Sequence, residues 1–391
     1  MPAPFTCIAV LPPGLEELGA TELAELGAEA VQPLRRAVAF RCDLACFYRL
    51  HLRALLPFRI LRQLGRFPCD GPQDLYAGVQ AAADWDHWLP PHRSFRVEVS
   101  GTAPGLTHSH FTALQVKNAL VDQQRQRWGE RSSIDLDAPD LCLHLHLGRA
   151  SGGARGQRAG NEAVLSLDGS SGSLHRRGWR AAMGLAPLKE NLAAGLIRAT
   201  GWDGHVPLAD PLCGSGTLLI EAACAELGRT PARTLALQRW ADFNAELWKR
   251  ESAAAAGLAR QELADGSPLS PIVGMERDPA VLEQAQANAT AAGVAPWLEL
   301  QSGDCRDFVP PQTPGVIVCN PPYGERLGAG EDLEQLYADL GAMVKQRCSG
   351  WTLWLLSGNP ELTGALRMKA SRRLPVSNGG IDCRWLRYEI R

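Results

Sequence analysis

Apolar residues in the first part of the chain alternate between two spacings. Short apolar runs without a helical repeat predict three strands, at residues 5–10, 38–42 and 58–64. Apolar residues three or four positions apart predict two helices between them, at residues 15–26 and 47–55. Strands and helices in this order are typical of a small α+β unit of the ferredoxin-like kind, to which we assign residues 1–68.

The same kind of pattern continues to about residue 165. It predicts further helices and strands, at residues 74–89, 94–100, 109–128 and 140–147. His144 and His146 lie on one face of the last of these strands. No third ligand follows at a useful spacing, so two solvent-facing histidines are favoured over a metal site. We assign residues 69–165 to a second domain.

From about residue 186 onward, strands and helices repeat in turn. Apolar runs predict strands at residues 206–210, 271–276, 297–304, 315–320, 351–356 and 383–390. This alternation indicates a parallel sheet wound with helices. We therefore expect an α/β domain over residues 186–391, in which residues 229–270 form an insertion with helices.

An arginine-rich segment, residues 149–180, precedes the α/β domain. Its arginines stand among glycines and serines, and only Glu162 and Asp168 oppose them. One interpretation is a solvated linker, which we place at residues 166–185. The interpretation that we favour is a surface that follows the phosphates of a nucleic acid, because the segment leads directly into the α/β domain.

Composition limits the number of domains, the cellular compartment and the kind of partner that we expect. A chain of 391 residues with 45% apolar residues can form two or three domains with real cores, and no run approaches the roughly 20 apolar residues of a membrane span. The N-terminus lacks a signal-peptide pattern, and the 11 cysteines include no C-x-x-C pair. We expect a reducing cytoplasm. Because the net charge is −2, any contact with nucleic acid must come from a local basic patch.

Two glycines follow the first strand of the α/β domain. Asp210 ends this strand, and the sequence Pro-Leu-Cys-Gly214-Ser-Gly216-Thr217 leads into a helix. Glycine lets the backbone approach a ligand closely, and the helix N-terminus offers N–H groups to a carboxylate or phosphate. The turn is not a Walker loop, because no Gly-Lys-Ser/Thr follows, and it lacks the full dinucleotide fingerprint.

Acidic residues end the next two strands. The spacing of Glu276 from the glycine turn fits a carboxylate that holds both ribose hydroxyls, and Asp304 is placed to accept a hydrogen bond from an adenine amino group. Asp278 is instead the expected cap of the next helix, because Pro279 suits the first helical position. Three acids at successive strand ends favour a cofactor with an adenosine and a charged tail over unrelated surface carboxylates.

The fourth strand is followed by Asn320-Pro321-Pro322-Tyr323. Neither proline can donate to a sheet, and each restricts the residue before it to extended backbone. The pattern predicts a stiff loop at the carboxyl end of a strand, where ligands bind in α/β sheets. An amide acceptor beside an aromatic ring suits a planar base that carries an exocyclic amine.

These motifs, in this order, resemble those of class I S-adenosylmethionine-dependent amino-methyltransferases. A closer resemblance is to the THUMP-containing bacterial rRNA guanine-N2 methyltransferases, of the type that methylates 23S rRNA. The segments that carry this closer resemblance are Pro13–Leu18, Ile134–Asp140, Leu174–Arg180, Ala186–Leu192 and Asn320–Arg326. The resemblance covers nearly the whole chain, in the form with a single methyltransferase domain. It implies a Rossmann-like domain with a seven-stranded, mostly parallel sheet, preceded by ferredoxin-like and THUMP RNA-binding domains.

The resemblance also implies roles for single residues. Catalysis would depend on the loop Asn320, Pro321, Pro322 and Tyr323, where Asn320 and the Pro321 carbonyl accept from the amine and Tyr323 stacks on the extruded base. S-adenosylmethionine would be held by Asn191, Asp210, Pro211, Cys213, Gly214, Ser215, Gly216, Thr217, Glu276, Arg277, Asp304, Cys305 and Asn320. RNA would contact Arg155, Arg158, Arg176, Arg177, Arg180, Lys189 and Arg326. No metal and no covalent nucleophile is expected, and the enzyme is expected to be a monomer.

Three alternatives stay open. The Asn-Pro-Pro-Tyr motif is shared with DNA adenine methyltransferases, so N6-methylation of adenine in DNA or RNA is one of them. A tRNA guanine-N2 methyltransferase with the same domain order is the second. The third is a non-catalytic RNA-binding protein, which the presence of Asn320, Tyr323 and all three acids argues against. An N-terminal half without a helix-turn-helix signature favours RNA over DNA, as an isolated 23S rRNA or an assembling ribosomal particle.

Overall fold

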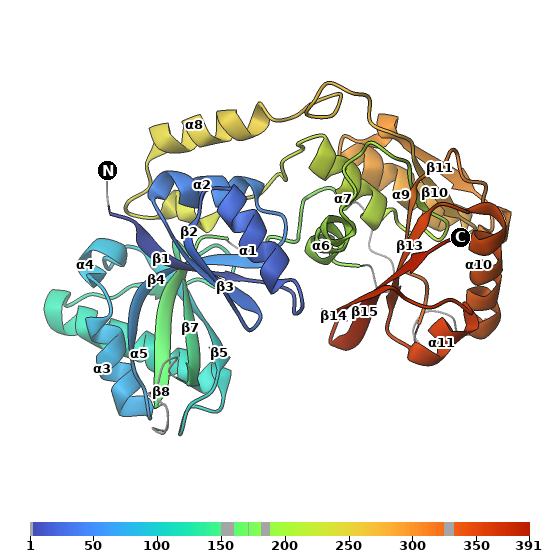
Figure 1. Cartoon of the computed structure of the whole chain (residues 1–391). Helices are drawn as coiled ribbons and strands as arrows, with labels where there is room; N and C mark the ends of the chain where they lie inside the picture. The colour runs from blue at the N-terminus through green and yellow to red at the C-terminus, as the bar shows by residue number, and fades with distance from the viewer. Residues whose placement is uncertain (1–2, 150–159, 171, 181–187, 324–331) are drawn as a thin grey trace.

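The computed structural model describes residues 3–149, 160–170, 172–180, 188–323 and 332–391. The chain forms two bodies, each built around one β-sheet, with the N-terminal body drawn in blue to green and the C-terminal body mostly in green to red (Figure 1). Among these residues, every helix is too short or too polar to span a lipid bilayer.

The first sheet has eight strands in the order β2-β3-β1-β4-β8-β7-β5-β6. They are β1 (Phe5–Val10), β2 (Glu29–Leu34), β3 (Ala37–Cys42), β4 (Arg59–Pro68), β5 (Ser94–Gly101), β6 (Ser133–Ile134), β7 (Leu141–Arg149) and β8 (Asn161–Asp168). β4 pairs with β8 in antiparallel fashion, with Leu61 opposite Asp168 and Pro68 opposite Glu162. The two predicted N-terminal domains therefore share one continuous sheet, while their boundaries at 1–68 and 69–165 stay a prediction.

The described part of this body has five helices: α1 (Glu16–Glu25), α2 (Leu44–Arg53), α3 (Pro72–Ala81), α4 (Trp85–Trp88) and α5 (Ser109–Trp128). The bounds of α5 agree with the prediction. The single helix predicted at residues 74–89 is instead two helices, because the Asp84 side chain accepts a hydrogen bond from the His87 backbone N–H and starts a new one.

The second sheet has seven strands in the order β11-β10-β9-β12-β13-β15-β14. They are β9 (Leu208–Asp210), β10 (Ile272–Glu276), β11 (Leu298–Ser302), β12 (Val316–Cys319), β13 (Thr352–Ser357), β14 (Arg372–Asn378) and β15 (Ile381–Glu389). The first five in this order are parallel, and β15 runs antiparallel to both β13 and β14. The predicted seven-stranded, mostly parallel sheet is confirmed.

Helices bury both faces of this sheet. The larger ones are α6 (Glu190–Thr200), α7 (Thr217–Glu226), α9 (Pro279–Ala291) and α10 (Leu333–Arg347); short turns are η2 (Ala295–Trp297), η3 (Cys305–Asp307) and α11 (Pro360–Ala365). Along β12 the side chains alternate: Val318 packs with α6 and α7, whereas Ile317 and Cys319 pack with α10. Burial on both faces explains why this strand is continuously apolar.

The insertion in the α/β domain, residues 229–270, packs on the N-terminal body. It contains η1 (Ala236–Arg239) and α8 (Ala245–Ala256), which lies above α2 in Figure 1. The Tyr48 hydroxyl accepts a hydrogen bond from the Asn244 N–H at 2.9 Å, and Arg49 forms an ion pair with Glu251 at 3.1 Å. The buried Trp240 ring adds an apolar contact with Phe47. The insertion therefore clamps the two bodies together.

A second junction surrounds the loop between α2 and β4. The buried Glu22 carboxylate accepts from the backbone N–H groups of Leu55 and Leu56 at 2.7 and 3.1 Å. From the other body, Arg177 donates to the Leu55 carbonyl and Asn191 donates to the Leu56 carbonyl. Both carbonyls and both N–H groups of this dipeptide are thus occupied by buried side chains, which fixes the junction.

Four strands were not predicted: β2, β6, β8 and β14. β8 matters most, because it lies in the arginine-rich segment that the sequence assigned to a surface or linker. Residues 163–168 are buried in the middle of the first sheet, so this part of the segment is core. Apolar residues of β8 packed between neighbouring strands outweigh the flanking charges.

Candidate active site

The carboxyl ends of β9, β10 and β12 border one cavity of about 280 Å³. The strand order reverses between β9 and β12, which is the switch point where ligands bind in doubly wound sheets. The wall is formed by Leu212, Gly214, Glu276, Arg277, Gly303, Asp304, Cys305, Asn320, Pro322 and Leu336. Six of the predicted cofactor residues therefore meet here: Gly214, Glu276, Arg277, Asp304, Cys305 and Asn320.

The glycine turn after β9 has the backbone shape that the sequence predicted. Gly214 has φ +54°, and a Cβ atom built on it would meet no atom within 4 Å, so its cavity side is open. Gly216 has φ +79° and precedes the first residue of α7, Thr217. The Gly214 N–H donates to Glu276 Oε2 at 3.1 Å, which ties the turn to the end of β10. Pro211, Cys213 and Ser215 complete this turn.

Asp210 is a buried carboxyl group at the end of β9. Burial raises its pKa to about 8, against the opposing effect of the Leu212 N–H, which donates to Asp210 Oδ1 at 3.0 Å. The negative charge of Glu276 raises this pKa further. An ionised Asp210 therefore needs a cation, and no arginine or lysine ion pair supplies one within the described residues.

Glu276 and Asp304 lie in the cavity wall but already have partners. Glu276 Oε1 accepts from the Asp278 N–H at 2.9 Å, and Asp278 caps α9 as predicted, accepting from Ala280 N–H. Asp304 forms two hydrogen bonds with the Arg306 guanidinium, at 2.8 and 2.9 Å. The Arg306 hydrogen bonds lower the pKa of Asp304 to about 2, so this carboxylate is ionised at neutral pH. Each carboxylate keeps lone pairs for a further hydrogen bond.

Asn320 presents a buried acceptor beside the cavity. Its Oδ1 atom is shielded from solvent and has no hydrogen-bond partner among the residues that the structure describes. An orphaned buried carbonyl oxygen costs about 1–3 kcal/mol, and a donor on a molecule bound in the cavity would offset that cost. Pro321 is buried and Pro322 forms part of the cavity wall, which fixes the loop as the prolines predicted.

Tyr323, the last motif residue, is held by its hydroxyl. Its oxygen accepts from Asn378 Nδ2 at 2.7 Å and lies 3.7 Å from the Cys383 sulfur. Its ring rests against Gly358, where a Cβ atom would come within 2.5 Å of Cδ2. Burial raises the pKa of the hydroxyl well above its usual range, so the ring stays neutral. Stacking of this ring on a base stays a prediction.

The predicted RNA-binding residues separate into three groups. Arg176 and Lys189 are exposed, and the Lys189 ammonium lies 5.1 Å from the centre of the Phe58 ring. Arg180 is largely buried and bonds with Glu190 and Thr217. Arg177 is buried like Arg180, and the last three residues with an RNA assignment, Arg155, Arg158 and Arg326, lie outside the described residues.

The position of Arg177 contradicts its predicted role in binding RNA. Only 2% of it is exposed, and its guanidinium bonds with the Glu221 carboxylate and the carbonyls of Leu55 and Leu174. A side chain in this position has no face left for a phosphate, so Arg177 holds the two bodies together instead. The sequence could not distinguish it from the neighbouring Arg176, because both stand in the same polar surroundings.

Asn191 lies away from the cavity wall. It is fully buried, and its amide donates to the Leu56 carbonyl at 3.1 Å, across the junction between the bodies. A contact with the cofactor stays a prediction for this residue. Conversely, Leu212, Gly303 and Leu336 line the cavity and were not predicted. The helical spacing of Leu333, Leu336 and Leu340 was the available signal for α10, which supplies Leu336.

Family profiles match three parts of the chain. A profile described as an RMKL-like methyltransferase domain matches residues 177–387, a THUMP domain matches residues 72–151, and an RlmL ferredoxin-like domain matches residues 6–61. These matches confirm the predicted domain types and their order.

Known proteins match over the whole length of the chain. A protein of Synechocystis sp. that is named as an RNA methyltransferase is 41% identical over 380 residues, which are 96% of this chain and 94% of that protein. The ribosomal RNA large subunit methyltransferase K/L of Ectopseudomonas mendocina is 39% identical, covering 99% of this chain but 53% of that protein. The chain thus spans about half the length of that relative. A solved structure of a methyltransferase-like protein complexed with SAH has a TM-score of 0.85 and 26% identity, covering 100% of this chain and 99% of that one.

Proposed function

The chain belongs to the RMKL-like methyltransferase family, and we propose that it methylates the exocyclic N2 amine of a guanosine in 23S rRNA. The observation that carries the proposal is the Asn320 Oδ1 atom, a buried acceptor without a partner at the edge of the cavity. The rRNA part rests on the relatives of the large-subunit K/L type and on the THUMP match.

The methyl donor is S-adenosylmethionine, whose sulfonium makes the methyl carbon open to attack by an amine. The residues present fit its parts. The open side of Gly214 and the start of α7 suit the carboxylate, and buried Asp210 lacks the cation that an α-ammonium group would provide. Glu276 suits the ribose hydroxyls and Asp304 suits the adenine amine. Of these groups, Gly214, Glu276 and Asp304 line the cavity, whereas Asp210 and the start of α7 lie outside its wall.

The chain's own contribution to catalysis is positioning and electrostatics. Asn320 Oδ1 and the Pro321 carbonyl oxygen would each accept one N–H hydrogen of the guanine amine, which directs the nitrogen lone pair at the methyl carbon. As the new C–N bond forms and the C–S bond breaks, positive charge develops on the nitrogen, and both oxygens stabilise it. The excess proton then leaves the amine for water.

The N-terminal body would bind the RNA. The ferredoxin-like and THUMP segments share one sheet and are clamped to the catalytic body, so a bound RNA would stand in a defined position relative to the cavity. The base must leave its stack to reach Asn320, at a cost of about a few kcal/mol. Stacking on Tyr323, about 1–3 kcal/mol per base, would offset part of that cost. We place the activity in the cytoplasm, with the enzyme acting as a monomer.

Mass-spectrometric mapping of methylated nucleosides in a strain that lacks the gene tests the proposal. We expect one N2-methylguanosine to disappear from 23S rRNA and to return when the wild-type gene is supplied, but not when Asn320→Ala is supplied. Loss of N2-methylguanosine from tRNA, or of N6-methyladenosine from any nucleic acid, would replace the substrate assignment with one of the alternatives. An unchanged methylation map would contradict the function itself.

A further inference from the structure

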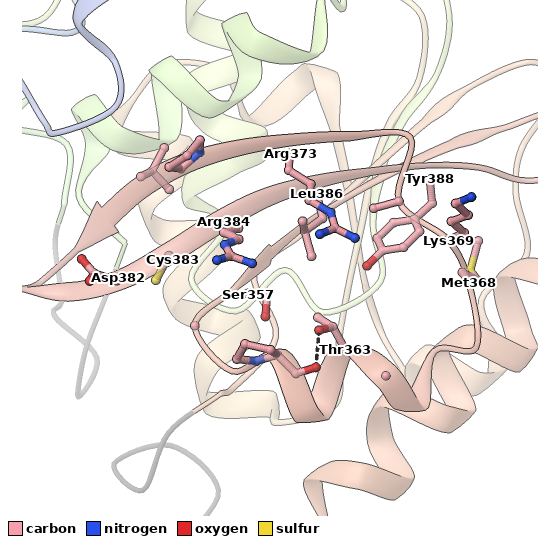
Figure 2. A pocket seen from close by; sticks show the side chains of 16 residues that line it. Ser357, Thr363, Met368, Lys369, Arg373, Asp382, Cys383, Arg384, Leu386 and Tyr388 are labelled. Carbon is pink, nitrogen blue, oxygen red and sulfur yellow. Dashed lines mark hydrogen bonds between the residues drawn. The ribbon is translucent and has the colours of Figure 1, made fainter.

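A second and larger cavity adjoins Tyr323. It has a volume of about 880 Å³ and lies between α11 and the hairpin of β14 and β15 (Figure 2). Gly358, against which the Tyr323 ring rests, and Cys383, whose sulfur is 3.7 Å from the Tyr323 oxygen, both line it. Tyr323 therefore contacts the wall of this groove, and it stands three residues after Asn320, which borders the smaller cavity.

Three cations line the groove: Lys369, Arg373 and Arg384. All three are exposed, and none forms an ion pair with a residue that the structure describes. Arg373 and Arg384 belong to one face of the hairpin, because β14 and β15 pair Arg373 with Leu386 and Pro375 with Arg384. Figure 2 shows both guanidinium groups directed from the hairpin toward the groove.

The charge of the groove is one-sided. Among the described residues that line it, Asp382 is the only carboxylate, so three positive charges stand against one negative charge. The whole chain has a net charge of −2, which makes an accumulation of unpaired cations here a local feature. The hydroxyls of Ser357 and Thr363 lie on the opposite wall and donate to backbone carbonyls. The groups that are left to bind a charged ligand are therefore mainly the three cations.

We propose that this groove holds the sugar-phosphate backbone of the RNA next to the target nucleotide. The inference rests on the proposed function and names the surface that the substrate strand follows as it enters the site. The guanidinium groups of Arg373 and Arg384 can bind phosphate oxygens in bidentate fashion, and the Lys369 ammonium adds a third positive charge. Three cations spread along one groove suit a strand of phosphates better than one small anion. A base that is extruded past Tyr323 must carry its flanking phosphates along, and the groove begins where Tyr323 ends.

Charge reversal on opposite faces of one strand tests the inference. Arg373 and Arg372 are neighbours on β14; both are exposed, but only Arg373 lines the groove. The variants Arg373→Glu and Arg372→Glu change the net charge equally, and Arg384→Glu provides a second groove variant. The probe is 23S rRNA extracted from a strain that lacks the gene, with binding measured between about 50 and 200 mM salt.

We expect Arg373→Glu and Arg384→Glu to weaken RNA binding by about five- to tenfold, and to reduce the slope of log K against log salt by about 0.7 per lost phosphate contact. Arg372→Glu should bind like the wild type. Binding of S-adenosylhomocysteine should be unchanged in all three variants, because none of these residues lines the smaller cavity. Ultraviolet cross-linking of the bound RNA should label peptides from residues 372–384.

Two outcomes distinguish failure of the groove inference from failure of the proposed function. If the wild type binds and methylates the RNA while Arg373→Glu and Arg372→Glu behave alike, the groove does not hold the RNA, although the proposed function stands. If the wild type neither binds nor methylates this RNA, the proposed function fails and the groove inference fails with it.

Discussion

The guanidinium of Arg177 lies 3.4 Å from the carboxylate of Glu221, and both side chains are almost completely buried. The pair joins the segment before the α/β domain to α7, and Arg177 also reaches the Leu55 carbonyl in the N-terminal body. Arg177, which the sequence analysis assigned to an RNA-binding surface, is therefore a structural residue at the junction between the two bodies. It stabilises the junction between the two bodies.

Replacing Arg177 should therefore destabilise the protein. Arg177→Ala leaves the Glu221 carboxylate buried without its partner, which costs about 3–5 kcal/mol. We expect the free energy of unfolding in urea to fall by that amount. Arg176→Ala, at an exposed neighbour, should change it by less than about 0.5 kcal/mol. Equal stability of the two variants would show that the pair does not hold the junction.

Asn320→Ala should slow methyl transfer strongly, with little effect on cofactor binding. Removing an acceptor for the developing charge lowers kcat by about 10²–10³-fold. Asn320→Asp keeps an acceptor oxygen and should lose less activity. Single-turnover methylation and calorimetric binding of S-adenosylhomocysteine measure the two effects separately. Asn244→Ala, which removes the cap of the remote helix α8, is the control with expected wild-type turnover.

Asp210 should make cofactor affinity depend on pH. Its folded pKa of about 8 lies above the usual value of 3.8, so the carboxyl group is protonated below pH 8 in the free protein. A bound ammonium favours the carboxylate, so binding releases a proton, and affinity should rise up to about tenfold per unit of pH toward pH 8 and then level off. Calorimetry of S-adenosylhomocysteine in buffers of different ionisation enthalpy counts that proton.

The same raised pKa affects folding. The native state binds a proton that the unfolded chain has lost above pH 3.8, so the contribution of Asp210 to stability falls as pH rises from about 4 to 8. Asp210→Asn should remove this dependence together with the proton release. A variant that still releases one proton on binding would place the titrating group elsewhere.

Gly214 and Gly201 form a matched pair for the turn. Both have positive φ, +54° and +73°, and a Cβ atom on either would meet no atom within 4 Å. Substitution by alanine should therefore cost both variants a similar backbone strain, about 1–2 kcal/mol. Only Gly214 borders the cavity, so only Gly214→Ala should lose affinity for S-adenosylhomocysteine. Equal affinity of the two variants would show that the cofactor does not bind at this turn.

The sequence predicted what depends on short-range pattern. The apolar runs identified the parallel strands, and Asp210, Gly214, Glu276, Asp304 and Asn320 stand at their carboxyl ends as expected. What it missed depends on long-range packing. The pairing of β4 with β8, which joins two predicted domains into one sheet, leaves no local signal. Neither does the burial of Arg177, which Glu221 and the Leu55 carbonyl create from elsewhere in the chain.

The continuous eight-stranded sheet fixes the distances between its outer strands and the rest of the protein. The hydrogen bonds between β4 and β8 leave no hinge between the ferredoxin-like and THUMP parts among the described residues. The buried hydrogen bonds to Leu55 and Leu56 likewise leave no hinge between the N-terminal body and the catalytic body. The span from the outer strands to Asn320 is thus set by the protein and not by the nucleic acid. Under the proposed function, we expect this fixed span to select the nucleotide by its distance along a folded RNA and not by the bases around it.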